Sequence, residues 1–283
     1  MSQADQSPRM SMDSRYRELH GKRETGERTA FQLDLAKRDK DHPEQLVGDF
    51  LYSVQEAGRF QPNEGERFHG GRKAGALDGA RERFQSGKSK VPNTYLVAAG
   101  MIDHGIACED LPEVIYVDRE IKPGRITGAT GETETLTDIT TDLILATKLG
   151  QPVICEVKAK NDQNAYYALI QGLAACAQLS SGSQRERLAE HSEWAQKTLV
   201  AQGKGGRTPD EYVPVLAEGP MELWIVLVEH ADHGEEKTAL REIATELASK
   251  LTDNEEVAET VSRIRIVEAD LEERPVLLRP RQP

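Results

Sequence analysis

Two β-forming stretches joined by a short connection constrain the fold of this chain more than any other feature. Residues 136–147 and 153–159 are rich in Leu, Ile, Val and Thr, and a Leu-Gly-Gln-Pro sequence at 149–152 supplies a tight connection between them. A third β-forming stretch begins at 114–117 and leads to the Lys-Pro-Gly turn signal at 122–124. The three stretches together predict a β-meander.

Helical and strand-like periods alternate after the meander. Residues 165–179 carry an apolar stripe at helical spacing, and we expect Asn161 or Asp162 to be the N-cap of this helix. A buried strand over 221–228, a helix over 235–251 and a last strand over 263–267 follow. This alternation predicts an α/β fold with a central β-sheet.

The distribution of apolar residues predicts how the chain is divided. Residues 1–40 are polar without a periodic apolar face, which predicts a flexible N-terminal tail. Residues 41–112 form an N-terminal helical region, whose first helix begins with Asp41 as N-cap and Glu44 at the capping-box position. Residues 113–270 form the core, with a helical insertion near 180–218, and 271–283 form a C-terminal tail.

Composition excludes several classes of protein. The net charge of −12 argues against indiscriminate binding to nucleic acid, although residues 1–90 hold 17 Lys and Arg against 15 Asp and Glu, so that the acidic excess lies in the rest. The three cysteines have no CxxC spacing, which argues against a zinc site or a disulfide framework. The longest apolar run, 223–228, is too short to span a membrane, and the polar first 20 residues lack a signal sequence. We therefore expect a cytoplasmic protein with no membrane partner.

Charged side chains at the ends of two neighbouring strands carry the chemistry. Alternation along a strand places Glu156 and Lys158 on one face, and a hairpin around Gly150 brings Asp142 beside Glu156. Two carboxylates and the backbone carbonyl of Val157 suit a hard divalent cation, Mg²⁺ or Mn²⁺. Lys158 then lies within reach of a metal-bound water and of the attacked phosphate.

Two further residues could extend this set. Asp138 shares the strand face of Asp142 and could assist or replace it, although a strand-start residue in a polar loop is the simpler interpretation. Lys160, two residues beyond Lys158, is a candidate phosphate contact.

The pattern Asp142, Glu156-Val157-Lys158 resembles the motif of the PD-(D/E)XK, or restriction-endonuclease-like, nuclease superfamily. The resemblance implies a helix, a three-stranded meander, a crossover helix and a further strand, which build a central mixed β-sheet flanked by helices. It also implies roles for Tyr167 and Gln171, four residues apart on the crossover helix, near the site, with Gln171 among the catalytic residues. It further implies an acid on the first helix, with Glu56 as the first candidate and Asp49 as the second. The chain departs from the motif at Thr141, where proline is frequent.

The resemblance implies a metal-dependent nuclease, an Mg²⁺-dependent endonuclease or phosphodiesterase, that acts on DNA, with RNA as an alternative substrate. The competing hypothesis is a non-catalytic module that binds nucleic acid or protein and retains the nuclease fold. Because the chain is acidic, nucleic-acid affinity would have to come from local patches, in the N-terminal region or on a partner protein. A partner protein or a homodimer is therefore among the expected partners.

Overall fold

The computed structural model describes residues 9–21, 28–57, 60–61, 93–121, 125–126, 139–159, 164–201, 203, 212–228 and 235–281. Its helices are α1 (Met12–Gly21), α2 (Arg28–Asp41), α3 (Pro43–Glu56), α5 (Asn93–His104), α6 (Ala165–Leu179), α7 (Gly182–Ala201), α8 (Glu235–Thr252) and α9 (Glu255–Ala258). Its strands are β1 (Phe60–Gln61), β2 (Ile106–Cys108), β3 (Val114–Ile121), β4 (Arg125–Ile126), β5 (Thr141–Thr147), β6 (Pro152–Ala159), β7 (Met221–Val228), β8 (Val261–Asp270) and β9 (Val276–Pro280).

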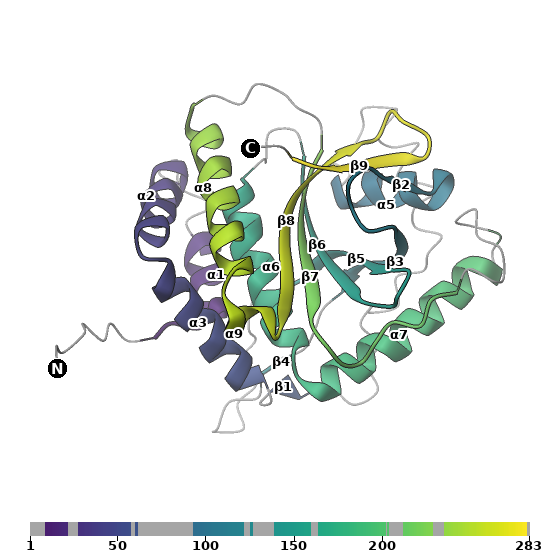
Figure 1. Cartoon of the computed structure of the whole chain (residues 1–283), viewed down its shortest axis with the longest axis horizontal. Helices are drawn as coiled ribbons and strands as arrows, with labels where there is room; N and C mark the ends of the chain where they lie inside the picture. Colours follow the sequence, from purple (N-terminus) through teal and green to yellow (C-terminus); the bar gives the residue numbers. More distant parts are fainter. Residues whose placement is uncertain are drawn as a thin grey trace.

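A mixed sheet forms the centre of the described residues (Figure 1). Seven strands lie in the order β2-β9-β8-β7-β6-β5-β3, and β1 pairs separately with β4. The predicted meander is β3-β5-β6, which is antiparallel throughout. Strands β6, β7 and β8 are parallel, and β8 and β9 are antiparallel. The expectation of an α/β fold with a central mixed sheet flanked by helices is therefore confirmed.

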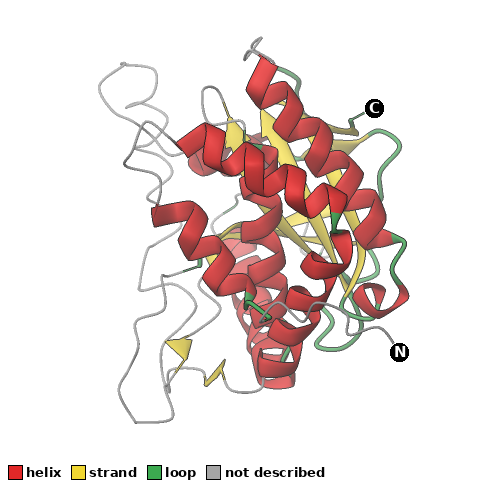
Figure 2. Cartoon of the chain, turned by 90° about the vertical axis from the view of Figure 1, so that its left-hand side faces the viewer, coloured by secondary structure: helices red, strands yellow, loops and turns green. Residues whose placement is uncertain are grey.

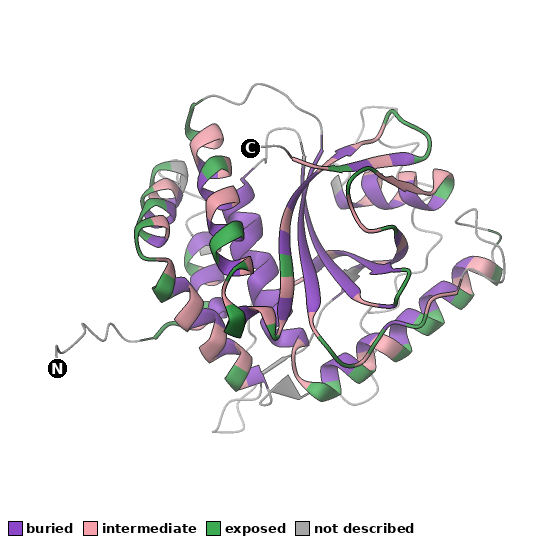
Figure 3. Ribbon diagram, viewed as in Figure 1, coloured by how far each residue is buried: buried purple, intermediate pink, exposed green. Residues whose placement is uncertain are grey.

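The burial of β7 and α6 follows from their sequences. Every residue of β7 is buried, as a continuous apolar run requires when a parallel strand is covered on both faces. Every residue of α6 is buried as well, because this helix lies between the sheet and an outer layer of helices (Figure 3). Its N-cap is Asn164, whose side chain accepts a hydrogen bond from the Tyr167 amide, and not Asn161 or Asp162, which lie outside the described residues.

Two hydrophobic clusters lie on the two faces of the sheet. One joins α1, α2, α3, α6 and α8 to the sheet, and Figure 2 shows this helical layer in front of the strands. The other joins α5 and Leu199 of α7 to the opposite face. Within the described residues, no helix is long and apolar enough to cross a membrane.

The prediction of a flexible tail over 1–40 is wrong for the residues that the structure describes. Residues 12–21 and 28–41 are helical, and Met12, Tyr16 and Leu19 are buried at i, i+4 and i+7 along α1. Three apolar residues within a polar decapeptide do not produce a strong periodic signal. Their burial depends on a partner surface, α6, that is distant in the sequence.

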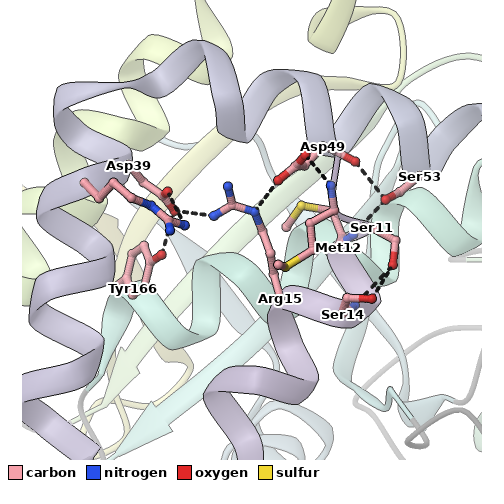
Figure 4. Close-up of polar contacts among 10 residues, drawn as sticks. Ser11, Met12, Ser14, Arg15, Asp39, Asp49, Ser53 and Tyr166 are labelled. Carbon is pink, nitrogen blue, oxygen red and sulfur yellow. Dashed lines mark hydrogen bonds and ion pairs between the residues drawn. The ribbon is translucent and has the colours of Figure 1, made fainter. Parts of the chain in front are cut away.

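Buried polar contacts fix these N-terminal helices to the core (Figure 4). Arg15 of α1 donates to Asp49 of α3 at 2.6 Å and to Asp39 of α2 at 2.7 Å. The Tyr166 hydroxyl of α6 donates to the same Asp39 oxygen at 2.7 Å. Asp49 also accepts from the backbone amide of Met10. A buried arginine with two carboxylate partners holds three helices in one arrangement, and removal of one partner from such a network is costly.

Several other boundaries in the structure differ from those expected from the sequence. Asp41 ends α2, and His42 is the N-cap of α3, with Pro43 at its first position. Residues 276–280 form β9 and pair with β8 and β2, so the predicted C-terminal tail includes a strand of the sheet. The pairing of β2 also places residues 106–108, assigned to the N-terminal helical region, in the main sheet. The helix expected within 180–218 is α7.

Candidate active site

The hairpin of β5 and β6 brings the two predicted carboxylates together. Leu143 pairs with Cys155 in the antiparallel register, so Asp142 and Glu156 are the next residues along each strand. The connection needs Gly150, which has φ +85° and whose backbone lies against the carbonyl of Pro214. The side chains of Asp142, Glu156 and Lys158 share the sheet face that α6 covers.

Asp142 is fixed by three groups. Its Oδ2 accepts a hydrogen bond from the backbone amide of Val157 at 2.8 Å, and its Oδ1 accepts one from the hydroxyl of Thr94 at 3.2 Å. The Nζ of Lys158 lies 3.9 Å from Oδ2. A carboxylate held from both β6 and α5 has little freedom to turn away from its neighbours.

Glu156 is fully buried, and among the described residues no N–H group donates to either carboxyl oxygen, whereas the carboxyl of Asp142 lies within hydrogen-bonding reach when one of the two is protonated. Burial raises the pKa of this carboxyl well above its usual value, and the neighbouring Asp142 charge raises the pKa further, whereas Lys158 acts in the opposite direction. Gly172 of α6 lies directly behind it, where an added Cβ would be 3.3 Å from Glu156 Cγ. The close approach of α6 therefore depends on glycine at this position.

Lys158 is held in a buried position between β6 and α6. Its Nζ donates to Gln171 Oε1 at 3.4 Å and lies 5.3 Å from the ring centroid of Tyr167. Gln171 Nε2 in turn donates to the Thr140 carbonyl at 3.0 Å. Gln171 therefore links the lysine to the start of β5 and orients the ammonium toward Asp142.

The other residues that were expected at the site lie in different places. Val157, the expected carbonyl ligand, directs its side chain into the opposite core cluster and its amide to Asp142. Within the described part of the chain, no group of three or more His, Cys, Asp or Glu side chains is arranged around one metal position, and the role of Glu56 stays a prediction. Asp49, the second candidate, belongs to the Arg15 network. Asp138 and Lys160 lie outside the described residues.

Sequence reasoning missed the residues that reach the site from other elements. Thr94 comes from α5, and Tyr16 and His20 come from α1, where Tyr16 and Tyr167 have ring centroids 5.5 Å apart. No local sequence signal identifies these residues, because each lies in a helix whose docking depends on distant contacts. Tyr167 and Gln171 carried a signal, since residues at i and i+4 share a helix face.

Asp142 and Glu156 offer carboxylate oxygens of the kind that a hard divalent cation takes as ligands. Two buried carboxylates side by side are costly to ionise together, and a cation shared between them would compensate both charges. Asp142 and Glu156 would supply oxygen ligands, and Lys158 stands beside them as a cation that does not itself ligate the metal. Such a set can bind a metal ion, hold a phosphate oxygen and stabilise negative charge that develops on it.

Comparisons with models of known protein families, with curated proteins and with solved structures find no match to this chain.

Proposed function

We propose that this protein is a metal-dependent nuclease that hydrolyses phosphodiester bonds in DNA, with Mg²⁺ or Mn²⁺ as cofactor. One observation carries the proposal: two carboxyl groups, Glu156 and Asp142, lie together in a buried place beside Lys158, and among the described residues no N–H group donates to Glu156. A fully buried carboxylate with a purely structural role would be expected to have an arginine or backbone amides as hydrogen-bond partners. A cation site explains why it does not.

The topology around the site supports a restriction-endonuclease-like core. The antiparallel meander β3-β5-β6 is followed by the helix α6 and then by β7, which is parallel to β6. This is the order of meander, crossover helix and further strand that the resemblance implies. Asp142 lies on the second meander strand and Glu156-Val157-Lys158 on the third, the strands on which the resemblance expects them, and this supports the proposal.

Each residue has a separate role in the proposed reaction. A bound Mg²⁺ would neutralise charge on the phosphate. Asp142 and Glu156 would hold the cation, and Lys158 would hold the attacking water or a non-bridging phosphate oxygen through its ammonium group. Gln171 keeps the ammonium in place. As the oxygen of the water bonds to phosphorus, the ester bond to the leaving oxygen breaks, and the proton that the water loses reaches the leaving oxygen through solvent.

The test is cleavage by the purified chain. Supercoiled plasmid, single- and double-stranded DNA and RNA oligonucleotides are incubated with Mg²⁺, Mn²⁺ or Ca²⁺, and products are separated by electrophoresis. Glu156→Gln should abolish metal-dependent cleavage. Glu222→Gln is a matched control, since Glu222 is a buried carboxylate on β7 that is bound to Trp224 and Arg265 outside the site.

Cleavage of DNA by the wild type and by Glu222→Gln, but not by Glu156→Gln, would support the proposal. Nucleic-acid binding without cleavage under any of the three metals would favour the non-catalytic module instead. Preferential cleavage of RNA would support the proposed active site and would show that its substrate is RNA and not DNA.

A further inference from the structure

An aromatic cluster from α1 lies against the residues that hold Lys158. Tyr16 and His20 are one helical turn apart, and their rings stack with centroids 5.6 Å apart. The ring of Tyr16 also contacts that of Tyr167, and His20 Nδ1 lies 3.0 Å from the Tyr167 hydroxyl. Two residues of the expected tail therefore contact a residue beside the site.

Tyr167 connects this cluster to Lys158. It precedes Gln171 by four residues on α6, so both side chains face the lysine. One face of its ring is directed to the Lys158 ammonium at 5.3 Å, and its hydroxyl contacts both His20 and the Tyr16 hydroxyl. A cation held over an aromatic ring depends on the ring orientation, and here His20, together with Tyr16, holds the hydroxyl end of the ring.

The cluster lies close to the charged groups. The charges of Glu156, Lys158 and Asp142 all act on the pKa of the Tyr16 hydroxyl, which is raised mainly by burial. The helix that carries Tyr16 and His20 is fixed by the buried Arg15 contacts. Because α1 is held in place, its side chains can restrict the orientation of the Tyr167 ring instead of moving with it.

We propose that His20 is a positioning residue for Lys158: through the Tyr167 hydroxyl it orients the ring that holds the lysine ammonium beside Asp142. The expected effect on catalysis rests on the proposed nuclease function. The expected effect on the environment of Lys158 does not, so the two effects are measured in separate experiments.

The first measurement follows the reactivity of Lys158 without metal or DNA. The full chain is treated briefly with the N-hydroxysuccinimide ester of acetic acid at pH 8, and acetylation of each lysine is quantified by peptide mass spectrometry, with exposed Lys197 as internal reference. Lys158 is nearly buried in the wild type. His20→Ala should raise its acetylation rate roughly 5- to 30-fold, the factor that corresponds to loss of a desolvated cation–π contact.

Variants of Tyr167 distinguish the loss of the contact between His20 and Tyr167 from a general loss of packing around Lys158. Tyr167→Phe, which removes the contacts of the hydroxyl with His20 and with Tyr16, should have at least the effect of His20→Ala, and His20→Ala should add little in the Tyr167→Phe background, because the hydroxyl that His20 contacts is then absent. His20→Asn, whose side-chain amide can still hydrogen-bond the hydroxyl, should restore protection. Tyr166→Phe is the matched control, since the adjacent hydroxyl binds Asp39 in the structural network.

The second measurement is cleavage by the same variants. His20→Ala should lower kcat by about the same 5- to 30-fold, with KM and Ca²⁺-supported DNA binding unchanged, and His20→Asn should recover most of the rate. Tyr166→Phe should cleave at the wild-type rate.

The outcomes distinguish the two proposals. Unchanged Lys158 acetylation in His20→Ala, or fully additive effects of His20→Ala and Tyr167→Phe, would overturn the positioning role while leaving a cleaving wild type as a nuclease. Coupled acetylation effects in a wild type that never cleaves would uphold the positioning role and reject the nuclease.

Discussion

Replacing Glu156 with Gln is expected to raise the free energy of unfolding of the metal-free protein at neutral and alkaline pH. The substitution keeps the shape of the side chain and removes a fully buried carboxyl whose pKa is raised by desolvation and by Asp142. The folded state therefore retains a proton that the unfolded chain has released. The wild type should lose stability as the pH rises above the unfolded pKa of about 4.3.

The magnitude follows from linkage. Between the unfolded pKa and the raised folded pKa, one retained proton lowers the free energy of unfolding by about 1.4 kcal/mol per pH unit. The stability that Glu156 contributes is fully present below the unfolded pKa and is lost as the pH rises through the folded pKa. The difference in stability between Glu156→Gln and the wild type should therefore grow with pH over this window, by about 1.4 kcal/mol per unit at most.

The assay is urea unfolding followed by circular dichroism at half-unit steps from pH 5 to 8.5, with a chelator present. Addition of Mg²⁺ should then stabilise the wild type, by about 2.7 kcal/mol at a hundredfold excess over its dissociation constant, and should leave Glu156→Gln unchanged. Glu222→Gln is the control. It should lower stability by about 1–3 kcal/mol, because Trp224 and Arg265 lose a charged partner.

The reasoning would be refuted by a Glu156→Gln variant that is less stable than the wild type at pH 8 without metal. A pH dependence identical to that of the wild type would refute it equally, since the carboxyl would then titrate as it does in the unfolded chain.

Three other substitutions test different parts of the structure. Lys158→Ala should fold and bind Mg²⁺ while single-turnover cleavage falls by about 10²- to 10⁴-fold; a wild-type rate would show that the lysine has no catalytic role. Arg15→Ala should cost about 3–5 kcal/mol in urea unfolding, because two buried carboxylates lose their cation; a loss under 1 kcal/mol would argue that α1 is not docked. Gly172→Ala should cost about 1–3 kcal/mol, because its Cβ would overlap Leu223 and crowd Glu156; unchanged stability would contradict the close approach of α6.

The sequence determined those elements whose signals are local. The helix over 165–179 and the strand over 221–228 have the bounds that their periodicity and flanking residues predict. The meander follows from three β-forming stretches and two turn signals. The juxtaposition of Asp142 and Glu156 is also a local result, because a hairpin around one glycine fixes the register and a period of two fixes the face.

The tertiary structure alone decided which polar segments belong to the core. Helices α1 and α2 have too few apolar residues to produce a periodic signal, and buried ion pairs to Asp39 and Asp49 hold α1 in place instead. Strand β9 is short, and its place in the sheet depends on β8 and on β2, which comes about 170 residues earlier. Thr94, Tyr16 and His20 reach the candidate site only through such long-range docking. Local propensity carries no information about which distant surface a helix or strand will meet, so these contacts could not be deduced from the sequence.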